Sequence, residues 1–177
     1  SQPGRLVYVL VRAKSADELV QLFSGEVWRF VASQISRRED AEDVVMEVFA
    51  AAFASFQKLE RADDQRLWLL AVARKKVADS LRRKYRQAET SYTDAHDTAG
   101  ASMFNETQIA TQSALAKLPE SERQVLILKY VNGLSTEEVG VVIRRSFAAT
   151  NSLLQRARQN MRQALGGQLA ETSGDLL

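Results

Sequence analysis

Cysteine is absent from the 177 residues, and proline and glycine are scarce, with two and eight copies. Without cysteine the chain has no disulfide framework, which suits a reducing compartment. So few helix-breaking residues favour long helices over this length. Hydrophobic residues nevertheless make up 45% of the chain. That share is enough for a packed core and excludes wholesale disorder.

Long hydrophobic runs are also missing. The N-terminal run Leu6–Val11 falls far short of the roughly 20 apolar residues that span a bilayer. It also lacks the cleavage pattern of a signal peptide. We therefore expect a soluble, cytoplasmic protein with no direct membrane insertion.

Residue types that carry catalysis are equally sparse. His96 is the only histidine, and it has no partners in the sequence for a metal site or a catalytic triad. No glycine-rich phosphate-binding loop occurs. We therefore predict that the chain is not an enzyme, and that it has no catalytic residue, metal site, cofactor or small-molecule substrate.

Charged residues are present and strongly segregated, although the net charge is only +2. Residues 39–47 contain five acids and no base, whereas residues 66–86 contain eight bases and one acid, a balance of +7. Residues 144–162 contain five arginines and no acid. One acidic block and two basic blocks indicate different partners for different faces of the molecule.

Three amphipathic helices are predicted in the first part of the chain. Ser15 and Glu18 have the spacing of a capping box, and Asp40 is a residue type that begins helices. A third helix is predicted from Arg66 to Arg86, after a polar loop at Lys58–Gln65. Apolar spacings of three and four predict the buried faces, formed by Leu19, Leu22, Phe23, Val27, Phe30 and Val31, then Val45, Val48, Phe49, Ala52, Phe53 and Phe56, then Leu67, Leu70, Ala71, Val77, Ala78 and Leu81.

A helix-turn-helix unit is predicted near the C-terminus. Ser135 and Glu138 form a second capping box and begin a short helix that ends at Ile143. A longer basic helix begins at Phe147 and is predicted to end at Gly166-Gly167. A short helix, a tight turn and a longer basic helix are the parts of this DNA-binding motif.

The sequence therefore predicts an all-α protein with two small helical domains. The segment between them is rich in threonine, serine, alanine and aspartate, which is the composition of a flexible or weakly helical linker. The predicted parts are an N-terminal arm (1–14), a first domain (15–87), a linker (88–112), a second domain (113–167) and a loose tail (168–177).

Three segments together resemble the extracytoplasmic-function (ECF) sigma factors of bacterial RNA polymerase. Residues 40–49 (DAEDVVMEVF) resemble an acidic signature of that family, and residues 68–83 resemble its promoter-melting helix. Residues 115–139 resemble the opening of its C-terminal domain. Each motif alone is weak, but all three in this order are specific, and the resemblance covers residues 15–87 and 113–165.

The resemblance implies a fold, a function and a set of partners. The first domain would be a sigma region 2 bundle, and the second a sigma region 4 helix-turn-helix. The chain would bind core RNA polymerase, through its beta-prime coiled coil and beta flap, and direct promoter recognition, DNA melting and transcription initiation. Promoter DNA and an anti-sigma factor would be further partners, and the polymerase would supply the catalysis.

The predicted polymerase-binding residues are Asp40, Asp43 and Glu47. Their spacing of three and four residues places the carboxylates on one helical face. An acidic side chain near a helix N-terminus also stabilises the helix, by roughly 0.3–1 kcal/mol. A charged, solvated face is therefore an alternative explanation for these three residues. Glu47 lies two turns into the helix and gains little from that effect. The resemblance implies that this face docks on the basic coiled coil of the beta-prime subunit.

The basic helix is predicted to bind the minus-ten region of the promoter. A charge of +7 on one helix is hard to explain by stability, because like charges repel. The resemblance implies that the loop before this helix holds an unstacked base, whereas core packing and base stacking are both open for its tryptophan. The predicted contacts are Arg61, Asp63, Asp64, Gln65, Trp68, Lys75, Arg82, Arg83 and Arg86.

The helix-turn-helix is predicted to read the minus-thirty-five region in the major groove. The predicted contacts are Arg144, Arg145, Asn151, Ser152, Gln155, Arg156 and Arg158. Relatives have glycine at the position of Arg144, and Lys or Arg at the positions of Asn151 and Leu153. Leu153 is outside the expected core stripe of Thr150, Leu154 and Ala157. We therefore expect Leu153 to face outward, so that Leu153→Arg would strengthen DNA binding.

Two other functions are open on the sequence alone. The altered recognition helix favours an interaction protein that keeps the sigma fold as a decoy or adaptor, with weakened promoter binding. A stand-alone helix-turn-helix regulator is the second alternative, but it gives no role to the acidic helix or the melting-type helix. Run-off transcription with core polymerase would separate all three.

Overall fold

The computed structural model describes residues 12–90 and 106–174, and within these ranges it contains helices and no strand. The all-α prediction is therefore confirmed. The elements are α1 (Ala16–Ala32), α2 (Arg38–Ala54), α3 (Phe56–Glu60), α4 (Gln65–Thr90), α5 (Glu106–Lys117), α6 (Glu120–Leu126), the π-helical turn η1 (Ile127–Val131), α7 (Thr136–Ile143) and α8 (Phe147–Gly174). Predictions for residues 1–11, 91–105 and 175–177, including His96, lie outside the described residues.

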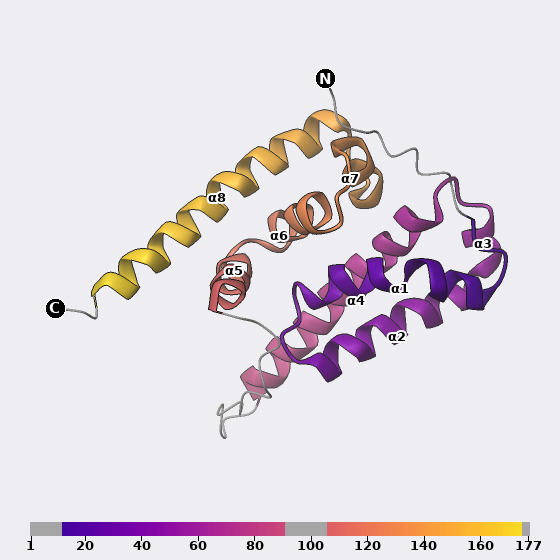
Figure 1. Cartoon of the computed structure of the whole chain (residues 1–177), viewed down its shortest axis with the longest axis horizontal. Coiled ribbons are helices and arrows are strands. Elements are labelled where there is room, and N and C mark those ends of the chain that lie inside the picture. Colours follow the sequence, from indigo (N-terminus) through magenta and orange to yellow (C-terminus); the bar gives the residue numbers. More distant parts are fainter. Residues whose placement is uncertain (1–11, 91–105, 175–177) are drawn as a thin grey trace.

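Helices α1, α2 and α4 form a three-helix core (Figure 1). Ser15 caps α1 as predicted, because its hydroxyl accepts the Glu18 backbone N–H at 3.3 Å. The prediction that Leu22 is buried is wrong, since it is 44% exposed. At 100° per residue, Leu22 lies outside the arc covered by the buried residues Leu19, Val27, Phe30 and Val31.

Helix α2 begins two residues earlier than predicted. Arg37 stands at the N-cap and makes no side-chain cap bond, so Asp40 lies inside the first turn with Glu39. There both acids favour the positive end of the helix dipole. The buried face is formed by Ala41, Val44, Val48, Phe49 and Ala52. Phe53 is 41% exposed, contrary to the prediction. It lies at the edge of the helix surface that these buried residues cover, and so its ring reaches solvent.

The predicted loop at residues 58–65 is partly wrong. Residues Phe56–Glu60 form the short helix α3, and its residue Leu59 is fully buried. Gln65 is the first residue of α4. Its buried amide group bonds both backbone polar groups of Ala13, at 2.7 and 3.0 Å. This pair of bonds ties the segment before α1 to the start of α4.

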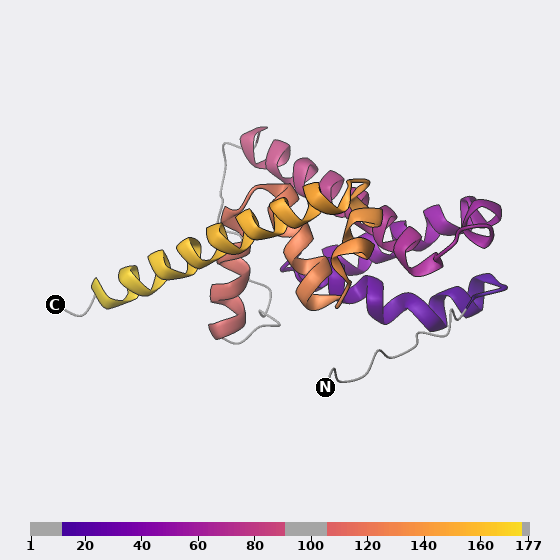
Figure 2. The ribbon, with the colours of Figure 1, turned by 90° about the horizontal axis from the view of Figure 1, so that it is seen from above.

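Helices α5 to α8 form a second group. Helix α5 begins at Glu106, so residues 106–112, predicted as linker, are helical, and α5 packs against α8. Helix α8 does not end at Gly166-Gly167, as predicted, but continues to Gly174. No proline follows the two glycines, and the next residues (QLAE) are mostly good helix formers. Figure 2 shows α8 extending away from the other helices.

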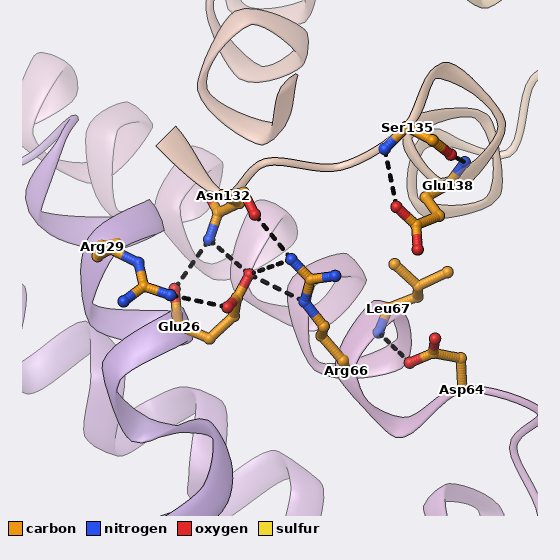
Figure 3. Close-up of polar contacts among 8 residues, drawn as sticks. All are labelled: Glu26, Arg29, Asp64, Arg66, Leu67, Asn132, Ser135 and Glu138. Atoms are coloured by element: carbon orange, nitrogen blue, oxygen red, sulfur yellow. Dashed lines mark hydrogen bonds and ion pairs between the residues drawn. The ribbon is translucent and has the colours of Figure 1, made fainter. Parts of the chain in front are cut away.

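The two groups of helices pack against each other rather than lying apart. Helix α4 contacts α7, and α1 contacts η1. At the centre, the Arg66 guanidinium bonds the Glu26 carboxylate at 2.9 Å and the Asn132 carbonyl at 2.7 Å (Figure 3). The Asn132 amide donates to the same carboxylate at 3.1 Å. The Glu26 and Arg66 side chains are each only 13% exposed, so this network is largely withdrawn from water.

Candidate nucleic-acid and partner interfaces

The three carboxylates predicted on α2 share one face of the helix, and none of them is buried. Asp43 is exposed, while Asp40 and Glu47 are partly covered. Asp40 forms an ion pair with Lys84 at 2.6 Å. Glu47 forms ion pairs with Arg83 at 3.2 Å and with Lys76 at 3.7 Å. The acidic face of α2 therefore touches the basic face of α4.

A cleft lies between these two faces. Its α2 wall carries Asp40, Asp43 and Glu47, and its α4 wall carries Arg83 and Lys84. Lys84 and Lys76 were part of the basic block but were not among the predicted site residues. Their place in the basic block was the signal that the sequence held for both lysines. The acids that they contact lie more than 25 residues earlier, so local spacing did not reveal these pairs.

The remaining cations of α4 are in different situations. Lys75 and Arg86 are exposed. Arg82 lies 3.3 Å from Asp79 on its own helix and 3.3 Å from Glu120 at the start of α6. Lys75 and Arg86 thus have no ion pair among the described residues, while Arg82 and Arg83 are also exposed but contact carboxylates of the chain itself.

The segment before α4 holds fewer available groups than predicted. Arg61 and Asp63 are exposed. Asp64 instead caps α4 by accepting the Leu67 N–H at 3.1 Å (Figure 3). Gln65 is 4% exposed and its amide is hydrogen-bonded to the Ala13 backbone, so in this structure its side chain does not face solvent, where the predicted contact with DNA would need it. Trp68 is partly buried and packs against the core.

The helix-turn-helix is present as predicted, with an unusual turn. Ser135 and Glu138 form the full capping box at the start of α7, with bonds of 2.7 and 3.1 Å. Arg144 ends α7 in the left-handed conformation, with φ of 57°. This is the position where the family that the sequence resembles has glycine. A Cβ at Gly140 would lie 2.9 Å from the Arg145 carbonyl oxygen, so the turn is packed closely on α7.

The outward face of α8 carries mostly neutral polar groups. Ser152 and Gln155 are exposed, and Asn151 is partly exposed; Arg144 and Arg145 are exposed in the turn. Two of the predicted arginines make contacts within their own region. Arg156 pairs with Glu122 at 2.9 Å, and Arg158 donates to the Tyr130 hydroxyl at 3.1 Å.

Leu153 does not face outward. It is 3% exposed and belongs to the core, so the expectation that Leu153→Arg would add a phosphate contact is wrong. At 100° per residue, position 153 lies next to Ala157 on the helix surface. The buried face of α8 is therefore wider than the stripe of Thr150, Leu154 and Ala157. An arginine there would place a charge in an apolar environment.

A buried carboxylate holds α6 to α8. Glu122 is 3% exposed and accepts bonds from Arg156 and from the Asn160 amide, the latter at 2.7 Å. Beside it, burial lowers the pKa of the Arg123 guanidinium from its ordinary value, while Glu120 acts in the opposite direction. Sequence reasoning missed Glu122 because an acid in a first helical turn normally indicates only a favourable helix dipole.

An apolar pocket of about 370 Å³ lies on the second group of helices. Its walls come from α5, α6, η1 and α8, and include Leu115, Ile127 and Met161. Tyr130 and Val131 line it and are 60% and 40% exposed. Sequence reasoning did not find this pocket, because its walls come from four separate helical segments.

Within ranges 12–90 and 106–174, no group of three or more His, Cys, Asp or Glu side chains is arranged to hold a metal ion. In the same part of the chain, every helix is too short or too polar to cross a membrane.

Comparison with known families and proteins gives a consistent match. The model of sigma-70 region 2 matches residues 19–87, and that of sigma-70 region 4 matches residues 108–161. The chain is 29% identical over 167 residues to the ECF RNA polymerase sigma factor SigE of Mycolicibacterium smegmatis, covering 90% of this chain and 65% of that protein. It is 26% identical over 155 residues to the ECF sigma factor SigM of Bacillus subtilis, covering 82% and 92%. The chain thus spans slightly less than two thirds of SigE and most of SigM.

A solved structure shows the same fold. It is the sigma factor RpoE in complex with the anti-sigma factor NepR from Bartonella quintana, with a TM-score of 0.67 and 21% identity. The similarity covers 87% of this chain and 98% of that one. Both groups of helices described above therefore have counterparts in a known sigma factor.

Proposed function

The chain belongs to the sigma-70 family, as an ECF-type RNA polymerase sigma factor, and we propose that it binds core RNA polymerase through α2 and promoter DNA through α4 and α8. The observation that carries this proposal is the pair of oppositely charged faces on α2 and α4, inside the stretch that matches sigma region 2. Polymerase supplies the catalysis, and the cytoplasm is the compartment where the chain would meet it.

The α2 carboxylates are the proposed polymerase contact. An exposed acidic face is complementary to a basic coiled coil such as that of the beta-prime subunit. Asp43→Arg with Glu47→Lys reverses this face at positions that are not buried, where substitutions usually change the free energy of unfolding by about 0.5 kcal/mol or less. We expect the double variant to fold normally and to lose co-purification with core polymerase.

A matched control keeps the same change in total charge. Asp17→Arg with Glu60→Lys also reverses two exposed carboxylates, but on α1 and α3. This variant should bind core polymerase as the unchanged chain does. Equal retention of polymerase by both double variants would remove the α2 assignment.

The basic face of α4 is the proposed contact with the minus-ten region. Lys75 and Arg86 are already exposed, and Arg82 and Arg83 are more than half exposed despite their ion pairs. Changing Arg82, Arg83 and Arg86 together to alanine should weaken promoter binding by the polymerase complex. Each lost phosphate contact should reduce the slope of log affinity against log salt by about 0.9. An unchanged slope would argue that this face does not touch DNA.

The outward face of α8 is the proposed reader of the minus-thirty-five region. Asn151 can form a bidentate pair with adenine, which is worth roughly 1–3 kcal/mol of discrimination against other bases. Asn151→Ala should therefore relax the preference at one base pair of the upstream element. Binding to a library of upstream sequences by the polymerase complex measures this preference directly.

An anti-sigma factor and the beta flap remain proposed partners. The solved relative RpoE is held by the anti-sigma factor NepR, and the present chain has an apolar pocket on its second group of helices. That pocket suits the apolar face of a partner helix. Tyr130→Ala would weaken such a contact, and this can be read from binding of the chain to polymerase and to candidate anti-sigma factors.

One observation favours the decoy or adaptor alternative. On the recognition helix, Leu153 is buried and Arg156 is paired with Glu122, so few cations face a DNA groove. A decoy would bind polymerase without supporting initiation. Run-off transcription with core polymerase tests this directly, because only a functional sigma factor yields promoter-specific transcripts.

A further inference from the structure

The two faces proposed to bind different partners are in direct contact with each other. Helices α2 and α4 pack side by side (Figure 1), and three ion pairs cross between them. Asp40 lies 2.6 Å from Lys84, and Glu47 lies 3.2 Å from Arg83 and 3.7 Å from Lys76. Carboxylates proposed for polymerase are therefore ion-paired with cations that could bind DNA in the free chain.

These ion pairs are of a kind that a partner can exchange. Their side chains are between 27% and 52% exposed, so water and salt screen the attraction, and exposed pairs contribute little to stability. A cation that faces a carboxylate is nevertheless less available to a phosphate, since the phosphate must displace the carboxylate. Weak internal pairs of this type compete with DNA without locking the fold.

We infer that Asp40 and Glu47 compete internally with DNA phosphates for Lys76, Arg83 and Lys84, and that a basic protein partner which takes these carboxylates frees the three cations for DNA. The inference rests on the proposed function, which assigns the acidic face to polymerase and the basic face to DNA. Binding of the two partners is then positively coupled, and by linkage the coupling is reciprocal. Sigma and promoter DNA would associate more tightly once polymerase is bound.

Asp43 provides an internal control for this inference. It lies on the same face of α2, one turn before Glu47, and is exposed. None of the ion pairs among the described residues involves Asp43. Removing its charge therefore changes the net charge by the same amount as removing that of Glu47, but releases no cation of α4.

The test compares Glu47→Gln with Asp43→Asn in the full chain, without polymerase. The probes are a labelled single-stranded and a labelled duplex oligonucleotide, titrated at several salt concentrations. Glu47→Gln frees Arg83 and Lys76, so we expect affinity to rise about 3- to 10-fold at low salt. The salt slope should steepen by about 0.7 to 0.9 for each new phosphate contact. Asp43→Asn should change affinity less than about two-fold and leave the salt slope unchanged.

A third variant separates release of cations from any change in the fold. In Glu47→Gln with Arg83→Ala, one of the two released cations is missing, so about half of the gain in the logarithm of the affinity should disappear. Equal affinities and slopes for Glu47→Gln and Asp43→Asn would overturn the inference, since only net charge would then matter. No gain in either variant would overturn it as well.

This experiment is independent of the polymerase assignment. The assay contains no polymerase, whereas docking on polymerase is tested by co-purification of the charge-reversed double variant. A gain with Glu47→Gln together with undiminished co-purification would keep the internal competition and reject α2 as the polymerase contact. Lost co-purification without any gain would reject the internal competition and keep the contact.

Discussion

The two groups of helices use charge in different ways. In α1 to α4, the pairs at Asp40 and Glu47 are partly exposed, lie at the surface and join two faces that are each proposed to bind a partner. In α5 to α8, Glu122 is buried and joins α6 to α8 within its own region. The comparison teaches that charges in the first group are available for exchange, while the central charge of the second group maintains its structure.

The largest expected effect tests the structural role of Glu122. Glu122→Ala removes a buried carboxylate and leaves Arg156 and Asn160 without their partner. Removing one member of a buried pair typically costs 3–5 kcal/mol. The Arg156 side chain is 63% exposed and stays hydrated, so we expect a loss of roughly 2–3 kcal/mol in chemical denaturation. The exposed acid of α7 offers the control, and Glu137→Ala should cost about 0.5 kcal/mol or less.

The next effect concerns the close packing of the turn, which also belongs to the second group. Gly140→Ala places a Cβ 2.9 Å from the Arg145 carbonyl oxygen, and the backbone must move to relieve this contact. We expect a cost of about 2 kcal/mol in thermal or chemical denaturation. Gly25→Ala in α1 is the matched control, since the nearest atom is 4.0 Å away. It should be neutral or stabilising by up to about 1 kcal/mol.

A smaller effect of opposite sign is expected at the end of α7. Arg144 adopts the left-handed conformation, which costs a residue with a Cβ roughly 1–2 kcal/mol. Glycine avoids this cost but loses more entropy on folding. Arg144→Gly should therefore raise the free energy of unfolding by up to about 1 kcal/mol. Destabilisation by this substitution would show that the Arg144 side chain holds the turn.

The smallest effect completes the comparison in the first group. Lys84→Ala removes the 2.6 Å ion pair with Asp40, which has the shortest separation in the cleft. Because the Lys84 side chain is 45% exposed, we expect the free energy of unfolding to change by about 0.5 kcal/mol or less. A loss comparable to that of Glu122→Ala would erase the distinction between exchangeable and structural charges.

Local patterns in the sequence predicted the helices and the charged face of α2. Ser15 and Ser135 cap helices as expected, because a capping box depends only on residues three positions apart. The carboxylates at Asp40, Asp43 and Glu47 share a face because helical periodicity alone determines this. Such features need no knowledge of what the helix packs against.

Features that depend on packing could not be predicted in the same way. The short helix α3 forms in a polar segment because the Leu59 side chain is buried there. Leu153 is buried because the core face of α8 is wide. The network of Glu26 with Asn132 joins residues 106 positions apart. Ion pairs between α2 and α4 likewise required the relative placement of two helices.

The packing of the two groups through Arg66 has a consequence for reach along DNA. The names of the two promoter elements imply a separation of about 25 base pairs, which at 3.4 Å each is roughly 85 Å of duplex. Among the described helices α8 is the longest, with 28 residues and a length of about 42 Å, and the two groups lie directly against each other. We therefore expect a chain that occupies both elements at once to have broken the bond between Arg66 and Asn132. The distance spanned on the promoter would then measure how far the two groups have separated.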